Sequence, residues 1–256
     1  MPLATLIHRA SLPSPQVSAE QALELLQEHY GLSGRLQALG SQQDLNYRVD
    51  SEQGRFVLKI CRGDYSALEL QAQHAGLKHL AAHPDVHVPR VIAAKNGADL
   101  LSLNVAGQAV HVRLLDYIEG QSLTHLEDFN PTVVAGFGRL CGEMDLALAD
   151  FDHPGLERTL QWDARHAQAL IAHLLPVIQD DNQRRLIAEA AEQAQRHLQP
   201  LESKLPVQAI HMVITDDNVV WQRDAQRHWQ LQGVIDFGDL VPVSYTHLTL
   251  PTILLV

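Results

Sequence analysis

The sequence predicts an α+β protein of two lobes, in which an antiparallel sheet lobe precedes a mainly helical lobe. Short apolar or alternating runs dominate residues 36–115, as is typical of an antiparallel meander. From residue 116 to residue 198 the apolar residues recur at helical spacing instead. Three later apolar runs, between residues 207 and 235, each end on a polar residue and predict further strands. With 256 residues, 46% of them hydrophobic, the chain is long enough to bury a core in both lobes.

The N-terminal lobe is expected to begin after a loose lead-in over residues 1–17. Ser18 and Gln21 have the spacing of a capping box, which predicts a helix that ends at Gly31. A five- or six-stranded sheet is predicted from strands at residues 36–39, 45–49, 56–60, 88–94, 100–105 and 109–115.

A second helix is predicted over residues 65–82, between the third and fourth strands. Its only acidic residue is Glu69, and four apolar residues mark its expected buried side, namely Leu68, Ala72, Ala75 and Leu80. The composition then changes at residues 116–120, which we interpret as a hinge. Helices are predicted beyond it at residues 133–148, 162–177 and 182–198. The expected organisation is a sheet lobe over 18–115, the hinge, and a helical lobe over 121–241.

Composition excludes several classes of partner. A formal net charge of -11 argues against nucleic acid and against an anionic membrane surface as general partners. No apolar run approaches the roughly 18 residues of a membrane span, and the first residues lack the apolar region of a signal peptide. Cys61 and Cys141 show no motif spacing, which favours reduced, buried cysteines in a cytoplasmic protein.

The stretch over residues 206–240 carries the strongest chemical signal. One apolar run delivers His211, and the next two runs begin after Asn218 and end on Asp236. If these runs are neighbouring strands, Asn218 and Asp236 lie together at their ends. A carboxylate and an amide oxygen suit Mg²⁺, which binds one or two protein ligands together with substrate phosphates.

Two residues of the N-terminal lobe add to this signal. Lys59 lies in the middle of an apolar strand, and Glu69 follows on the next helix, where it could pair with Lys59 and direct it at a phosphate. Each feature has a simpler explanation. The charged end of Lys59 could reach solvent, and Glu69 could be a solvated acid. Asn218 and Asp236 could be turn residues. Their occurrence together, in this order, predicts phosphoryl transfer.

The order of these residues resembles the protein-kinase-like fold, and within it the aminoglycoside phosphotransferase and choline kinase superfamily. Lys59 looks like the family's strand-borne phosphate lysine, and Glu69 looks like its helix partner. Residues 39–47 resemble the hairpin over the nucleotide phosphates, which implies roles for Ser41 and Asn46. Residues 114–120 resemble the hinge that receives adenine, which implies that Asp116 and Ile118 bind the nucleotide. ATP and Mg²⁺ are the implied cofactors.

The catalytic loop departs from the family's pattern at one position. Residues 211–218 resemble the motif His-x-Asp-x-x-x-x-Asn, but Val213 stands where the motif has its aspartate. Valine cannot accept a proton, and general-base help is worth about 10²–10⁴ in rate. Three explanations remain open: an impaired kinase, a sequence error or rare variant of an active parent, or replacement of the base by Asp216 or Asp217. Residues 235–239 resemble the metal-binding segment, with Asn218 and Asp236 as ligands.

The resemblance is greatest to the hydroxylysine-kinase-like branch, carried by residues 149–154 and 162–163. It implies transfer to the hydroxyl of a small amino alcohol, such as a hydroxylysine-, ethanolamine- or homoserine-like molecule. Three acids on the expected substrate side would suit a cationic amine, namely Asp216, Asp217 and Asp239. The branch includes kinase domains fused to a metallopeptidase-like segment and an aminotransferase, so covalently fused C-terminal domains are also expected. The alternative function is a non-catalytic, nucleotide-binding regulatory module.

The final residues have an unusual composition. Residues 242–256 carry no charge and resemble the conceptual translation of a sequencing-library adapter, with a terminal strand as the alternative. We therefore expect the natural sequence to depart after Val241 and the helical lobe to be truncated there, with no function in the tail.

Overall fold

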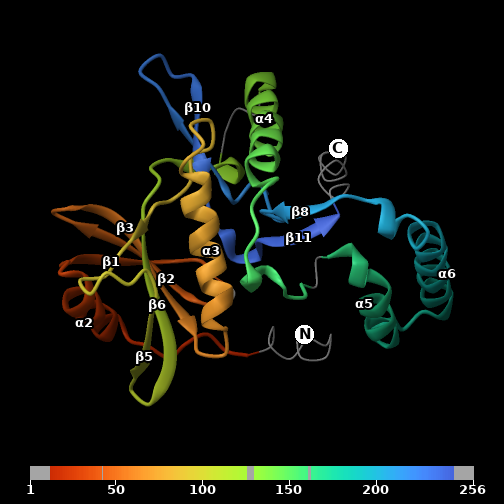
Figure 1. The fold of residues 1–256 in the computed structure, drawn as a ribbon, viewed down its shortest axis with the longest axis horizontal. Helices are drawn as coiled ribbons and strands as arrows, with labels where there is room; N and C mark the ends of the chain where they lie inside the picture. The colour runs from red at the N-terminus through yellow and green to blue at the C-terminus, as the bar shows by residue number, and fades with distance from the viewer. Residues whose placement is uncertain (1–11, 42, 126–129, 161–162, 245–256) are drawn as a thin grey trace.

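A six-stranded antiparallel sheet forms the N-terminal lobe (Figure 1). The computed structural model describes residues 12–41, 43–125, 130–160 and 163–244. The sheet runs in the order β1-β2-β3-β6-β4, with β5 also paired to β6. Its strands are β1 (Gly34–Leu39), β2 (Leu45–Ser51), β3 (Gly54–Arg62), β4 (Val91–Ile92), β5 (Leu101–Val105) and β6 (Gln108–Asp116). The predicted meander and fold class are confirmed.

Helix α2 (Ala19–Tyr30) covers one face of this sheet and begins and ends as predicted. Gln21 N donates to Ser18 Oγ at 3.2 Å, and Ser18 N donates to Gln21 Oε1 at 2.8 Å, so the capping box is complete. Gly31 closes the helix in the left-handed region, with φ at 70°. Leu26 is fully buried against the apolar side chains on that face of β3 and β6.

Helix α3 (Ala67–Leu80) covers the other face and also contacts the second lobe. The predicted burial of Ala72 and Leu80 is confirmed, but Leu68 is 45% exposed and its predicted burial is wrong. The helix buries Glu69 and Gly76 instead. A Cβ on Gly76 would lie 2.6 Å from a Leu240 side-chain carbon, which shows that this face packs against the second lobe. Hydrophobic spacing alone could not identify a face that is buried through polar residues.

The second lobe contains three α-helices in its described part: α4 (Pro131–Leu148), α5 (Ala167–Leu174) and α6 (Asp181–Leu198). The helix expected over residues 162–177 is shorter, since 3-10 turns flank α5, and Trp162 lies outside the described residues. Two small sheets complete the lobe. One joins β7 (Gln121–Ser122), β9 (Val219–Arg223) and β10 (Trp229–Val234), and the other joins β8 (Val207–Ile210) and β11 (Val241–Ser244).

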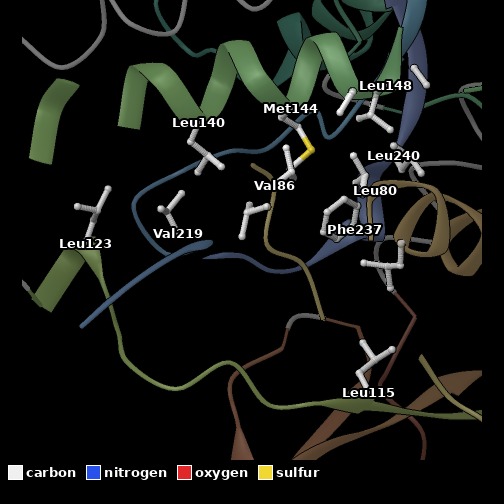
Figure 2. Close-up of a cluster of buried hydrophobic side chains, with 14 of the residues drawn as sticks. Leu80, Val86, Leu115, Leu123, Leu140, Met144, Leu148, Val219, Phe237 and Leu240 are labelled. Carbon is white, nitrogen blue, oxygen red and sulfur yellow. The ribbon is translucent and has the colours of Figure 1, made fainter. Parts of the chain in front are cut away.

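The core of the second lobe lies beneath α4 and fixes the segment that follows β10 (Figure 2). Leu140, Met144 and Leu148 point from α4 into a cluster that includes Val219, Phe237 and Leu240. Phe237 begins the 3-10 turn Phe237–Asp239, and Leu240 follows it. Because both side chains are at most 4% exposed, they anchor residues 236–240 in the core.

Strand β11 continues three residues past Val241. Val243 is fully buried, and the Pro242 carbonyl oxygen accepts a hydrogen bond from Arg165 Nη2 at 2.7 Å. The first residues of the expected tail therefore pair with β8, while residues 245–256 lie outside the described residues. Within the described chain, no helix is both long and apolar enough to span a bilayer.

Candidate active site

Asn218 and Asp236 lie at neighbouring strand ends, as the sequence predicts. Val219 pairs with Val234 in the β9–β10 ladder, and Ile235 N donates to Asn218 O at 2.9 Å. The Asn218 amide nitrogen donates to Val213 O at 2.9 Å. This bond orients the side chain and leaves its amide oxygen as the acceptor that a cation could use.

Asp236 occupies a strained backbone position at the centre of the site. Its φ of 64° and ψ of 70° place a non-glycine residue in the left-handed region, which costs about 1–3 kcal/mol. Lys59 Nζ lies 3.6 Å from Asp236 Oδ1. Lys59 is the main cause of a lowered Asp236 pKa, with His211 and Arg113 adding to it. Asp236 is therefore a carboxylate at neutral pH, as a cation ligand must be.

His211 connects the expected catalytic loop, residues 211–218, to the expected metal-binding segment, residues 235–239. It is fully buried, its Nε2 lies 2.9 Å from Ile235 O, and its ring packs edge-on against Phe237 at 4.6 Å between centroids. Burial lowers the pKa of the ring, so the histidine is neutral and Nε2 donates its proton to the carbonyl oxygen. These contacts hold the loop that begins at His211 against residues 235–237.

Val213 occupies the loop position between His211 and Asn218, and it is half-buried. Asp216 and Asp217 follow Val213 in the loop, and both are exposed. Thr124 Oγ1 lies 2.6 Å from Asp217 Oδ1 and 3.1 Å from Asp216 Oδ2. These contacts engage both carboxylates in binding the 3-10 turn Leu123–His125.

Lys59 and Glu69 do not form the pair expected from the sequence. Lys59 contacts Asp236, whereas Glu69 Oε1 lies 3.8 Å from Arg158 Nη1. Glu69 Oε2 accepts a hydrogen bond from Ser66 N at 2.9 Å, as part of the capping box that starts α3. Glu69 therefore interacts with the N-terminus of its own helix and with the Arg158 guanidinium, whereas Lys59 contacts Asp236.

Arg158 and Gln73 are site residues that the sequence did not reveal. Both donate to the Gly238 carbonyl oxygen, Gln73 Nε2 at 3.3 Å and Arg158 Nη2 through a short hydrogen bond. Arg158 Nη2 also donates to Leu240 O at 3.2 Å. Side chains from α3 and from the loop after Leu156 thus fix the backbone that carries Asp236. No sequence motif marks either residue, because the contacts join positions far apart in the chain.

The expected nucleotide-binding residues of the hairpin lie near β3. Ser41 Oγ accepts a hydrogen bond from Asp44 N at 3.1 Å, which shapes the turn between β1 and β2. Asn46 pairs with Lys59 across β2 and β3, and its buried amide oxygen has no hydrogen-bond partner among the described residues. Asn46 therefore has an unused acceptor beside the lysine.

The expected hinge follows β6. The Asp116 carboxylate is engaged by Arg90, whose Nε lies 2.6 Å from Asp116 Oδ2. Ile118 reaches the second lobe, since a Cβ on Gly233 would lie 2.8 Å from its side-chain methyl carbon. Because Arg90 engages the Asp116 carboxylate, the backbone groups of the hinge, and not the Asp116 side chain, are suited to bind a nucleotide base.

The three acids expected on the substrate side fall into two places. Asp216 and Asp217 face Thr124, while Asp239 lies in the 3-10 turn Phe237–Asp239 beside Asp236 and Arg158. Burial raises the Asp239 pKa, and Arg158 opposes that shift. No cluster of three or more metal-ligating acids, histidines or cysteines occurs among the described residues.

The chain matches known phosphotransferases over most of its length. The model of the phosphotransferase enzyme family matches residues 35–243. Hydroxylysine kinases of Danio rerio and Mus musculus are 25% and 24% identical to it, each match covering 88% of this chain. A homoserine kinase of Polaromonas naphthalenivorans (strain CJ2) is 27% identical over 78% of this chain. The chain spans 66%, 65% and 58% of these relatives, which is less than two thirds of their length.

Solved structures share the fold. A microcompartment-associated aminopropanol kinase is 20% identical, with a TM-score of 0.67 over 91% of this chain and 73% of its own. An amicoumacin kinase, solved with AMP-PNP and Ca²⁺, is 16% identical, with a TM-score of 0.70 over 97% of this chain and 70% of its own. These likenesses show the two-lobed protein-kinase-like fold. From the match over residues 35–243, the chain belongs to the phosphotransferase enzyme family.

Proposed function

We propose that the protein binds ATP and Mg²⁺ between its lobes and transfers the terminal phosphate to the hydroxyl of a small amino alcohol, with activity impaired by Val213. One observation carries this proposal. Lys59 from the N-terminal lobe lies against Asp236, and Asp236 lies at the strand end next to Asn218. A cation for phosphate and two oxygen ligands for a metal thus meet where the lobes join.

The residues present suit magnesium. The Asp236 carboxylate and the Asn218 amide oxygen are hard oxygen donors, and the hydrogen bond from Asn218 to Val213 O fixes the direction of that amide. Bound Mg²⁺ would neutralise charge on the transferred phosphate. Lys59 would then exchange its contact with Asp236 for one with the phosphates. Arg158 and Gln73 would keep the segment in place through the Gly238 carbonyl oxygen.

The nucleotide would extend from the hinge to the hairpin. Adenine would bind to backbone groups at Asp116 and Ile118, and the phosphates would lie beneath the turn that carries Ser41, near the free oxygen of Asn46. Glu69 would act indirectly, since its contact is with Arg158.

The acceptor is proposed from the relatives. Hydroxylysine kinases and a homoserine kinase, by their names, act on amino alcohols. Of the predicted substrate-side acids, Asp239 is the best placed for an amine, because it lies beside the metal-binding segment. Asp216 and Asp217 would serve as loop supports or as outer contacts. A cytoplasmic location and fused C-terminal domains remain predictions.

Val213 favours a second candidate function, a nucleotide-binding regulatory module without turnover. Both candidates require nucleotide and metal to bind, and they differ only in the transfer step. In either case the half-buried valine offers no group that could orient a hydroxyl.

Nucleotide binding and turnover can be measured separately. We expect ATP with Mg²⁺ to raise the melting temperature of the protein, and phosphate transfer to a panel of amino alcohols to be slow. Val213→Asp should raise kcat by about 10²–10⁴, and the matched control Val213→Asn, which cannot act as a base, should not. No thermal shift would refute both candidates. If the protein shows the thermal shift but the Val213→Asp variant still does not transfer phosphate, the regulatory module is favoured.

A further inference from the structure

Arg113 lies on β6 directly opposite Lys59 on β3. Side chains that face each other across an antiparallel pair project from the same face of the sheet, with Cβ atoms about 4.5–5.5 Å apart. The lysine of this pair contacts the expected metal-binding segment, since Lys59 Nζ lies 3.6 Å from Asp236 Oδ1. Two positive charges therefore lie side by side behind the metal-binding segment.

Arg113 is buried without a counter-charge of its own. Its side chain is 3% exposed, its Nε has no hydrogen-bond partner, and the described residues give its guanidinium no ion pair. Arg62 on β3 differs in its charge pairing: it is 4% exposed and its Nε also lacks a hydrogen bond, but that Nε forms an ion pair with Asp64 Oδ1 at 3.0 Å, and Nη1 donates to Leu12 O. A buried charge is strongly unfavourable unless it is paired. The fold thus keeps an arginine where a bound anion would stabilise it.

The nearby acids do not balance these cations. Asp236 is already in contact with Lys59. Asp44 accepts a weak hydrogen bond at 3.4 Å from Sγ of Cys61, which lies on β3 with Lys59, and its Oδ1 has no hydrogen-bond partner among the described residues. When a metal takes Asp236 as a ligand, Lys59 would lose that carboxylate. The positive charge at this point would then exceed the negative charge contributed by nearby side chains.

We propose that Arg113 is a second phosphate-binding residue, which binds the phosphate chain of the nucleoside triphosphate together with Lys59. The inference rests on the proposed function, because Lys59 is the phosphate lysine there. Arg113 lies on β6 of the N-terminal lobe, three positions before the expected hinge residue Asp116, and not among the loops of the second lobe. A guanidinium suits this role, because it can donate two parallel hydrogen bonds to one phosphate.

The test compares Arg113→Met with Arg62→Met, using inorganic tripolyphosphate and ATP with Mg²⁺ as probes. Binding is measured by calorimetry, and the melting temperature of the ligand-free protein by thermal unfolding. We expect Arg113→Met to raise the ligand-free melting temperature by about 2–4 °C and to weaken tripolyphosphate binding about 10- to 100-fold. Arg62→Met should lower the melting temperature and leave the affinity unchanged, because its charge is already paired.

The outcomes separate this inference from the proposed function. If the wild type binds both probes and Arg113→Met binds them equally well, Arg113 is not a phosphate ligand, and the proposed function stands. If the wild type binds neither probe, both proposals fail. Should Arg113→Met not fold, Arg113→Lys and Arg113→Gln provide the comparison: Lys keeps the charge and should bind tripolyphosphate more tightly than Gln. Equal affinities of these two variants would overturn the inference.

Discussion

Arg158 Nη1 lies 3.8 Å from Glu69 Oε1, and both side chains are less than a tenth exposed. The same guanidinium donates to the carbonyl oxygens of Gly238 and Leu240, so it joins the start of α3 to the turn that follows Asp236. A helix acid thus fixes residues 238–240 through an arginine, and the strand lysine contacts Asp236 instead. Disturbing this arginine should affect both stability and metal affinity.

We expect Arg158→Met to lower the free energy of unfolding by about 3–5 kcal/mol, because the buried Glu69 carboxylate loses a guanidinium and two backbone carbonyl oxygens lose a donor. Urea unfolding gives the value. The control is Arg185→Met on α6, whose ion pair with Glu189 is exposed and worth less than about 1 kcal/mol. A loss below 1 kcal/mol for Arg158→Met would show that the segment is held without it.

Asp236→Asn should abolish the magnesium-dependent part of the thermal shift produced by ATP. The change keeps the shape of the side chain and a residue type that tolerates a positive φ, but it removes the charge on the proposed metal ligand. ATP binding without metal should persist, because Lys59 no longer has a carboxylate beside it. Asp239→Asn is the matched control, three residues further along the same turn. An unchanged magnesium response in Asp236→Asn would place the metal elsewhere.

The sequence predicted those parts of the structure that local signals specify. The capping box at Ser18, the stop at Gly31 and the apolar runs that became β2 and β3 are decided within a few residues of the chain. Asn218 and Asp236 could be placed together because each follows directly from a strand end, and neighbouring runs in sequence became neighbouring strands.

The contacts between distant segments could not be predicted in this way. Glu69 has a near neighbour in Ser66 and a distant one in Arg158, and only the packing of the lobes decides that Arg158 is preferred to Lys59. The burial of Gln73 depends likewise on the approach of the second lobe to α3. Leu68 was misplaced for the same reason, since Glu69, Gln73 and His74 are buried on α3 together with its apolar residues.

Two glycine substitutions should change stability in opposite directions. Gly120, the last residue of the expected hinge, has φ at 141°, and a Cβ there would lie 2.4 Å from Trp221 O. Gly120→Ala should therefore cost about 1–3 kcal/mol. Gly142 lies inside α4 with open space around it, and Gly142→Ala should stabilise the protein by about 0.5–1 kcal/mol, because alanine is the better helix former. Thermal unfolding of the two variants measures both, and a destabilised Gly142→Ala would contradict the helix geometry.

Asp145 should make the stability fall as the pH rises. It lies in α4, is 6% exposed, and has an Oδ1 without a hydrogen-bond partner, so burial raises its pKa from 3.8 to about 6. Between these two values the folded protein binds more protons at this group than the unfolded chain does. The folded state therefore loses about 2–3 kcal/mol of stability through this group as the pH rises from about 4 to about 6, and the loss persists at higher pH.

Asp145→Asn removes that titration while it keeps the size of the side chain. We expect the variant to be more stable than the wild type at pH 8 and to differ little from it at pH 4, where the carboxyl is protonated in the folded protein. Urea unfolding across this range isolates the effect, because every other titrating group is common to the two proteins. If the free energies of unfolding of the two proteins instead change in parallel with pH, the Asp145 carboxylate is solvated in the folded state. The hydrogen bond from Gln208 Nε2 to the Asp145 backbone carbonyl oxygen, at 2.8 Å, would then not keep the carboxylate buried.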